Sequence, residues 1–319
     1  STMSVSSAGY GDLDKGAKTL NEAKEILDSI DLDAIEESYP VKGAELVKQV
    51  HYLKFGYEKS SLELVISKVA LALDENVRRS LLLQAVEVCK SYANAGHTYY
   101  ETTGDAKGLR HKYLATIELG NQLIEMDDTE GARLARVEAL SIIEEYAPND
   151  PSPNTDRSIA IAVYHLADVS SPQEAMQLLA RAIPLQRAVI KAEPDYSRRL
   201  RDLAFMLALR GSMHMVINTD IETGLDDIAE SASLLTRRAI NNPQERTAQN
   251  DFESNMLQFS KLLTDAGKPD LVRKICLGSI DKLKHVASGE SVAGREDWVE
   301  ILSRLRIQIE QPETAAVPQ

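Results

Sequence analysis

The chain has 319 residues and a formal net charge of −13. This length allows a large hydrophobic core, in one elongated domain or in two compact ones, and 16 glycines with 11 prolines are too few for a disordered chain. The acidic balance argues against general nucleic-acid binding, although a local basic groove stays open. Without a long apolar run or a signal-peptide pattern, we expect no membrane insertion and a cytoplasmic protein.

The composition favours helices. Ala, Leu, Glu, Arg and Lys dominate, aromatic residues make up only 5%, and no Asn-Gly or Asp-Gly turn joins alternating strand patterns. Both cysteines, Cys89 and Cys276, lie inside helical patterns among apolar neighbours, which predicts buried, reduced thiols. We therefore expect an all-α protein.

The N-terminal region shows helical spacing of apolar residues from residue 13 onward. Residues 1–12 are small and polar, and Ser1-Thr2 precede Met3. We interpret them as a disordered tail or a remnant of cloning, so that the chain could be a piece of a longer protein. The helices predicted here cover residues 13–30, 32–37, 41–55 and 62–73, with a turn at residues 56–60. After a polar break at residues 74–76, one helix or two continue over residues 77–103.

Residues 196–243 contain two amphipathic helical patterns separated by a polar break at residues 218–220. In the first pattern Leu200 and Leu203 begin an apolar face, and the second pattern ends at Pro243, which has no amide to continue a helix. Two antiparallel helices bury only one face each against the other. The outer faces need neighbours, which predicts a stacked repeat.

The same plan recurs along the chain. Gly96, Ala162 and Gly211 each lie the same number of residues before a predicted helix end. The segment between each of these small residues and that helix end contains a polar turn. The predicted turns lie at residues 103–105, 170–172, 218–220 and 265–269, and a proline-rich insertion occupies residues 147–154. A terminal capping helix is predicted over residues 294–309. Its apolar face would consist of Trp298, Ile301, Leu302, Leu305 and Ile309.

This pattern resembles the tetratricopeptide-repeat superfamily. The resemblance rests on a small residue at the expected helix crossings, on small residues in the second helices (Ala115, Ala182, Ala232) and on helix-ending prolines (Pro194, Pro243). The repeat is longer than is usual in this superfamily, and it is more similar to the extended repeats found beside bacterial serine/threonine kinase and signalling domains, although no kinase motif is present. The resemblance implies a right-handed α-solenoid of stacked antiparallel helix pairs. The predicted regions are residues 13–80 (N-terminal helices), 81–285 (repeats), 286–309 (cap) and 310–319 (tail).

The sequence offers no catalytic, metal or cofactor motif. The six histidines lack HxxxH or HExxH spacing, and no phosphate-binding or nucleophile motif occurs. The basic cluster of Arg198, Arg199, Arg201 and Arg210 suits an anionic peptide, although salt bridges within the repeats explain it as well. If the first helix of each pair lines a concave side, a partner-binding groove would be lined by His97, Tyr100, Arg201, Phe205, Arg210, Ser212, Met215, Asn250 and Lys261.

We therefore expect a non-catalytic scaffold that binds a peptide or protein segment. We expect it to bind no nucleic acid, cofactor or metal. The alternative is a regulatory or sensor domain of a larger bacterial signalling protein, which binds a small ligand or a partner. An enzyme on a helical fold is a third option, and His97 or His214 beside a carboxylate in a cleft would favour it. The first 80 residues would cap the solenoid or form a homodimer.

Overall fold

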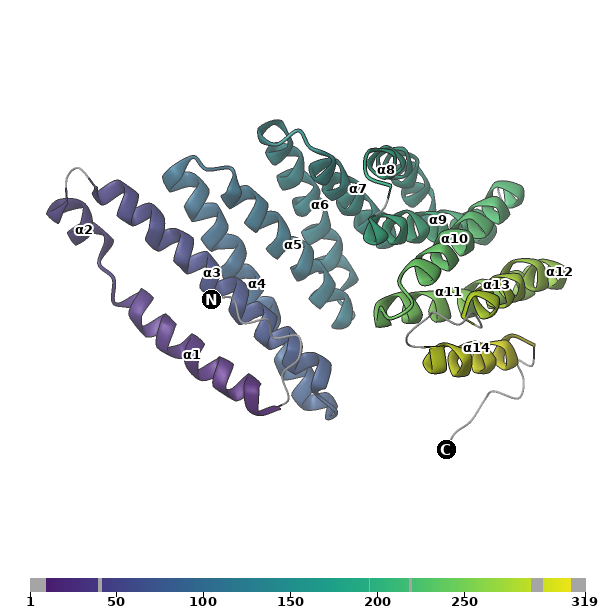
Figure 1. Cartoon of the computed structure of the whole chain (residues 1–319). Helices are drawn as coiled ribbons and strands as arrows, with labels where there is room; N and C mark the ends of the chain where they lie inside the picture. Colours follow the sequence, from purple (N-terminus) through teal and green to yellow (C-terminus); the bar gives the residue numbers. More distant parts are fainter. Residues whose placement is uncertain (1–9, 40–41, 195, 218–219, 288–294, 311–319) are drawn as a thin grey trace. The chain divides into compact units, whose positions relative to one another are not determined.

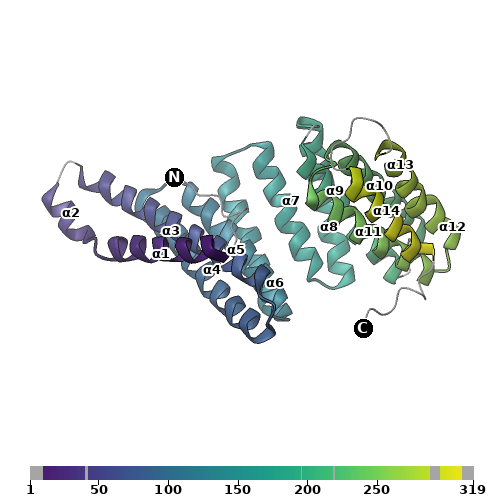
Figure 2. The same cartoon turned by 60° about the horizontal axis from the view of Figure 1, so that its bottom comes forward.

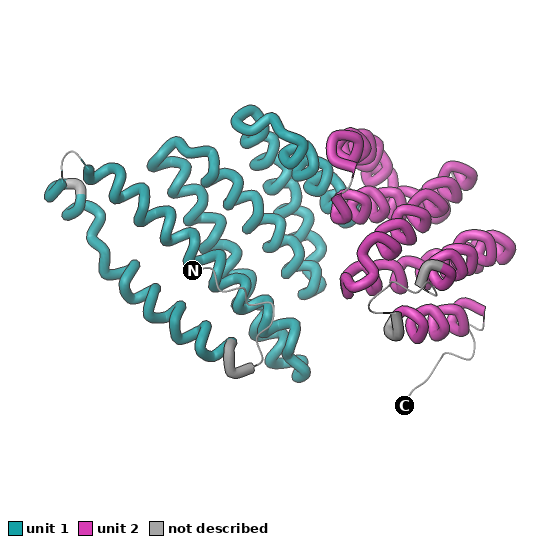
Figure 3. The backbone as a smooth tube through the Cα atoms, in the orientation of Figure 1, with its two compact units in different colours: residues 1–169 teal, residues 170–319 magenta. Residues whose placement is uncertain are grey.

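Helices make up nearly all of the described chain. The computed structural model describes residues 10–39, 42–194, 196–217, 220–287 and 295–310, and these residues contain no strand. Within each of two compact units, neighbouring helices pack against one another in an all-α, solenoid-like arrangement (Figure 1), which confirms the predicted fold class. The chain divides into two compact units, Ser1–Val169 and Ser170–Gln319 (Figure 3).

Unit 1 is a stack of antiparallel helices, in which α3, α4 and α5 lie side by side (Figures 1 and 2). Its helices are α1 (Tyr10–Asp28), α2 (Leu32–Ser38), α3 (Gly43–Leu71), α4 (Glu75–Thr103), α5 (Lys107–Glu125), α6 (Thr129–Tyr146), a 3₁₀ turn (Ala147–Asn149) and α7 (Pro153–Asp168). Aspartates cap the N-termini of three of them: Asp31 at α2, Asp74 at α4 and Asp128 at α6. Asp74 accepts a hydrogen bond from the Val77 amide at 2.9 Å, and Asp128 accepts one from the Gly131 amide at 2.9 Å.

Unit 2 consists of two alternating layers. Its helices are α8 (Pro172–Ala192), α9 (Ser197–Ile217), α10 (Ile221–Asn241), α11 (Arg246–Asp265), α12 (Pro269–Leu271), a π-helical turn (Val272–Leu277), α13 (Gly278–Ala287) and α14 (Arg295–Glu310). The helices α8, α10 and α13 form one layer, and α9, α11 and α14 form the other. Arginine–carboxylate pairs join neighbours within a layer, such as Arg187 with Glu230 across α8 and α10 at 2.6 Å.

The last helix, α14, closes the hydrophobic core of unit 2 as the sequence predicts. Trp298, Leu302 and Leu305 are buried against α11 and α13. The indole Nε1 of Trp298 donates a hydrogen bond of 2.7 Å to the carbonyl oxygen of Pro243, so the one polar atom of this large buried side chain is satisfied. The predicted first residue of this helix, Gly294, lies outside the described residues.

The predicted turn at residues 56–60 is wrong, because α3 runs without interruption through it. One glycine inside a helix costs only about 1 kcal/mol relative to alanine. The buried face of α3 continues on both sides of Gly56, with Phe55, Leu62 and Val65 in the core, and this packing outweighs the local cost. The pattern over residues 77–103 forms one helix, α4.

Two glycine pairs let consecutive helices approach closely. A Cβ atom on Gly108 would lie 2.4 Å from the carbonyl oxygen of Gly96, and one on Gly224 would lie 3.1 Å from that of Gly211. The first pair joins α4 and α5, and the second joins α9 and α10. The sequence prediction that helices cross at Gly96 and Gly211 is therefore confirmed. The sequence did not predict their partners at the crossings, Gly108 and Gly224.

Several predictions fall at the edges of the described chain. Of the predicted tail at residues 1–12, only residues 10–12 are described, and they belong to α1. Of the tail at residues 310–319, only Glu310 is described, as the last residue of α14. Residues 218–219 of the predicted break are not described, and Asp220 caps α10. The chain divides into its two units between Val169 and Ser170. The predicted domain boundaries at residues 80 and 285 are different divisions, and they stay predictions.

The thiols of Cys89 and Cys276 are buried and free, as predicted. Burial in apolar surroundings disfavours the thiolate and raises the pKa of each thiol to about 12. Neither cysteine is therefore a nucleophile near neutral pH. Among the described residues, no helix is both long enough and apolar enough to cross a membrane.

Candidate functional site

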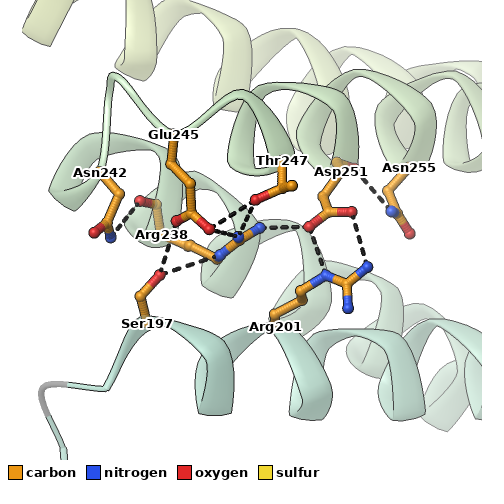
Figure 4. A network of polar contacts seen from close by, with 8 residues as sticks. All are labelled: Ser197, Arg201, Arg238, Asn242, Glu245, Thr247, Asp251 and Asn255. Atoms are coloured by element: carbon orange, nitrogen blue, oxygen red, sulfur yellow. Dashed lines mark hydrogen bonds and ion pairs between the residues drawn. The ribbon is translucent and has the colours of Figure 1, made fainter. Parts of the chain in front are cut away.

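The nine residues predicted to line a groove belong to two surfaces, one in each unit. His97 and Tyr100 lie on α4 of unit 1. The other seven lie on α9 and α11 of unit 2, and those helices run in the same direction, as the bonded residues in Figure 4 show.

In unit 2, four predicted residues follow one face of α9. Arg201, Phe205, Ser212 and Met215 are all half-buried, and Phe205 and Met215 pack against the hydrophobic core. On α11, the predicted Asn250 and Lys261 are exposed. The structure thus places these residues on two helices of one layer, α9 and α11, which the ion pair between Arg201 and Asp251 joins.

A group of ion pairs, here called the arginine network, links α9, α10 and α11 (Figure 4). Its residues are Ser197, Arg201, Arg238, Glu245, Thr247 and Asp251. The side chain of Arg238 is only 2% exposed. Its Nη1 atom is bound by Asp251, its Nη2 atom donates to Glu245 at 2.7 Å and to Thr247 at 3.0 Å, and its Nε atom donates to Ser197 at 3.2 Å.

The network compensates for burying charge. Partial burial opposes ionisation of Glu245, but the hydrogen bond from Thr247 and the positive charge of Arg238 outweigh it and hold the pKa of Glu245 below its usual value. A buried guanidinium is tolerated only when its donors are paired. Sequence analysis missed Arg238 and Asp251, although Arg238 lies in the conspicuous pair Arg237-Arg238.

Arg201 connects this network to the surface. Its Nε and Nη2 atoms donate to both oxygens of Asp251, at 2.7 and 3.3 Å. Its guanidinium carbon lies 4.5 Å from the centre of the Phe205 ring, within the range of a cation–π interaction. The Arg201 side chain is 40% exposed. A rigid arginine–aromatic pair is therefore presented to solvent on α9.

Two of the other arginines of the predicted basic cluster, Arg199 and Arg210, are also paired internally, whereas Arg198 is exposed. Arg210 donates to both oxygens of Asp227 at 2.6 and 2.7 Å, and these hydrogen bonds raise the pKa of Arg210 above its usual value. Arg199 is 2% exposed and pairs with Glu193 at 2.6 Å. The salt-bridge interpretation of this cluster therefore describes what the structure shows.

The two predicted residues of unit 1 differ in environment. His97 is exposed on α4. Tyr100 is half-buried and packs against the hydrophobic cluster that includes Leu109 and Tyr113 of α5. Its backbone also borders the Gly108 crossing, since a Cβ atom there would lie 2.7 Å from the Tyr100 nitrogen. Tyr100 therefore contributes to packing between α4 and α5.

The carboxylate near His214 is that of Asp220, and it serves as a helix cap. The side chain of His214 is buried beside Gly224. The neighbouring Asp220 uses its carboxylate to accept hydrogen bonds from the amide and hydroxyl of Thr223, at 3.1 and 2.8 Å, and its pKa is lowered. In the described part of the chain, no three His, Cys, Asp or Glu side chains are grouped as metal ligands.

A half-buried histidine whose contacts the sequence did not reveal lies in unit 1. The Nδ1 atom of His111 is 2.6 Å from the Tyr92 hydroxyl, and its ring stacks on Phe55 with centroids 4.2 Å apart. Burial disfavours the imidazolium, and the cations Lys59, Arg110 and Lys107 add to this effect, so the pKa of His111 falls to about 4.

We expect this histidine to make unit 1 less stable in mild acid. The folded state keeps His111 neutral down to about pH 4, whereas the unfolded chain binds a proton near its ordinary value of 6.5. The stabilising effect is complete above pH 6.5 and is lost as the pH falls toward 4. The loss amounts to about 2 kcal/mol after allowance for partial solvent exposure. Urea unfolding of wild type and His111→Gln between pH 7 and pH 4.5 would measure it. Identical pH slopes in both proteins would contradict the assignment.

Comparisons with known proteins give no family for this chain. No protein-family model matches it, and no curated protein matches it. A solved structure described as a circular tandem repeat protein with novel repeat topology and enhanced subunit contact surfaces is 16% identical. The match covers 94% of this chain and 76% of that one with a TM-score of 0.39. Another, from the computational design of self-assembling cyclic protein homooligomers, is 12% identical, with 92% and 94% covered and a TM-score of 0.17.

Proposed function

We propose that the protein is a non-catalytic interaction scaffold, and that unit 2 binds a segment of a partner protein on its α9–α11 surface. This surface comprises Arg201, Phe205, Met215, Asn250 and Lys261. The observation that carries the proposal is the Arg201–Phe205 pair, which is held by Asp251 and remains partly exposed. Arginine and aromatic residues dominate the binding energy of protein interfaces, and a fixed conformation reduces the entropy lost on binding.

We further propose that the helix pairs are of the tetratricopeptide type. Supporting this are the two glycine crossings, Gly96 with Gly108 and Gly211 with Gly224, which occupy equivalent places in the α4–α5 and α9–α10 pairs. Stacked helix pairs of this type present extended surfaces to protein partners.

Site-specific photo-crosslinking in lysate of the source organism would test the α9–α11 surface. We expect a photoreactive residue at Asn250 or at Lys261 to yield the same discrete adduct. A photoreactive residue at Asp226, which is exposed on α10 in the other layer of unit 2, should not yield it. Phe205→Leu keeps an apolar side chain but removes the cation–π contact, and it should reduce the adduct by about fivefold.

The surface would be the wrong one if Asp226 gave the same adduct as Asn250, or if Phe205→Leu left the yield unchanged while the adduct at Asn250 persisted. Arg201 is a poor choice for this test. Its substitution also removes a partner of Asp251, which holds the buried Arg238, so a loss of binding would not be distinguishable from a loss of structure.

A further inference from the structure

Unit 1 carries a basic and aromatic surface that no sequence motif reveals. The helices α3 and α5 flank α4 and run in the same direction (Figure 1). On α3, Lys48, Tyr52, Phe55 and Lys59 recur at helical spacing, and on α5 Lys107 and His111 do the same. The contact between Phe55 and His111 joins the two rows. We define the basic–aromatic face as Lys48, Tyr52, Lys59, Lys107 and His111.

The aromatic part of this face is rigid. Tyr52 is 51% exposed, and its ring packs edge-on against Phe55 with centroids 4.6 Å apart. Phe55 in turn packs on Tyr99, 5.2 Å away. The hydroxyl of Tyr99 donates to Asp105 at 3.0 Å. An exposed tyrosine supported in this way offers apolar area whose side-chain entropy is already lost.

The charges around the face are mainly positive, in a chain whose net charge is −13. The charges that act on His111 are those of Lys59, Arg110 and Lys107. Within the described ranges, neither Lys48 nor Lys107 forms an ion pair, and Lys59 pairs with Glu63 at 3.6 Å in an exposed position. Asp105 is close to both unpaired lysines, and their charges help to hold the pKa of its carboxyl below the usual value, so it offsets part of their positive charge.

The two units differ in this respect. In unit 2, Arg201, Arg210 and Arg238 are each neutralised by carboxylates of the same unit. In unit 1, Lys48 and Lys107 form no ion pair among the described residues, although the carboxylate of Asp105 lies near both. An anionic partner therefore meets less competition from carboxylates of the chain at the basic–aromatic face than at the arginines of unit 2.

We propose that the basic–aromatic face binds an acidic peptide segment containing an aromatic or aliphatic side chain. Carboxylates of the segment pair with Lys48 and Lys107, and the apolar side chain packs on Tyr52. A peptide fits better than a nucleic acid, because the few cations are interrupted by Glu63 and Asp105 and the whole chain is acidic, whereas a phosphate backbone requires a longer basic surface.

Fluorescence anisotropy with the full chain tests this inference, with a fluorescein-labelled random copolymer of Glu and Tyr as the probe. We expect wild type to bind it, and Lys48→Glu/Lys107→Glu to weaken binding by about tenfold or more. Tyr52→Ala should weaken it by about threefold. The matched control is Lys15→Glu/Lys18→Glu, which makes the same charge change at exposed positions of α1 in the same unit and should alter affinity by less than about twofold.

Three results would overturn the inference: no binding by wild type at low salt, equal losses in the two lysine pairs, or tighter binding of oligothymidylate than of the copolymer. The outcome is independent of the function proposed for unit 2. No variant in this experiment touches the α9–α11 surface, and Phe205→Leu should leave copolymer binding unchanged.

Discussion

We expect Gly108→Ala to destabilise unit 1 by about 3 kcal/mol or more. A Cβ atom at this position would lie 2.4 Å from the Gly96 carbonyl oxygen, 2.7 Å from the Tyr100 nitrogen and 2.8 Å from the Tyr100 Cβ atom. Two of these are backbone atoms, so no rotamer change relieves the clash. The helices α4 and α5 would have to separate, and the cores on either side would lose contacts. Urea unfolding, with hydrogen exchange to locate the loss, would measure the effect.

Gly56→Ala in α3 is the matched control for this change. It is also a glycine inside a helix of unit 1, but a Cβ atom there would meet no atom within 4 Å. The added methyl group restricts the unfolded chain and improves helix propensity, so we expect stabilisation by about 0.5 to 1 kcal/mol. Destabilisation of similar size in both variants would mean that the close approach of α4 and α5 is not what requires glycine at position 108.

These glycines also show how far sequence reasoning reaches. Equal spacing singles out Gly96 and Gly211 as crossing positions, because repeated helix pairs need a small residue at the same place in each pair. The partners Gly108 and Gly224 are not predicted, since which residue faces a crossing depends on the rotation of the second helix. At Gly56 the glycine wrongly predicts a turn, because the tertiary packing of α3 outweighs the low helix propensity of one glycine.

The candidate sites are harder to predict than the fold. Helical spacing places Arg201 and Phe205 on one face of α9, and the structure agrees. It does not show that Asp251, on a helix beyond α10, would bind Arg201. The basic–aromatic face is missed for the same reason, since its lysines come from α3 and α5, and periodicity within one helix carries no information about its neighbour. Comparing the rows of Lys48 and Lys107 could have suggested it.

The arginine network explains why unit 2 keeps so many charges inside. Its ion pairs are directional, so they fix the relative positions of α9, α10 and α11 more narrowly than apolar contacts do. Ser197, Arg238 and Asp251 come from three different helices and meet at one guanidinium. The Arg201–Phe205 pair is built on this arrangement, so the stability of the network and the shape of the proposed binding surface depend on the same carboxylate.

We expect Asp251→Asn to cost about 3 kcal/mol of unfolding free energy. The change keeps the size of the side chain but removes the charge that holds Arg238 and Arg201. Arg238 is 2% exposed and would retain Glu245, so the loss lies at the lower end for a broken buried ion pair. Chemical unfolding monitored by circular dichroism would measure it.

Glu253→Gln on the same helix is the control. Glu253 pairs with Arg304 at 2.6 Å, but the arginine side chain is 52% exposed, and pairs of this kind contribute about 0 to 1 kcal/mol. If the two variants cost the same, burial of Arg238 would not be what makes Asp251 necessary. If Asp251→Asn is costly and Glu253→Gln is not, the charge of Asp251 is what holds Arg238 and Arg201 in place beneath the α9–α11 surface.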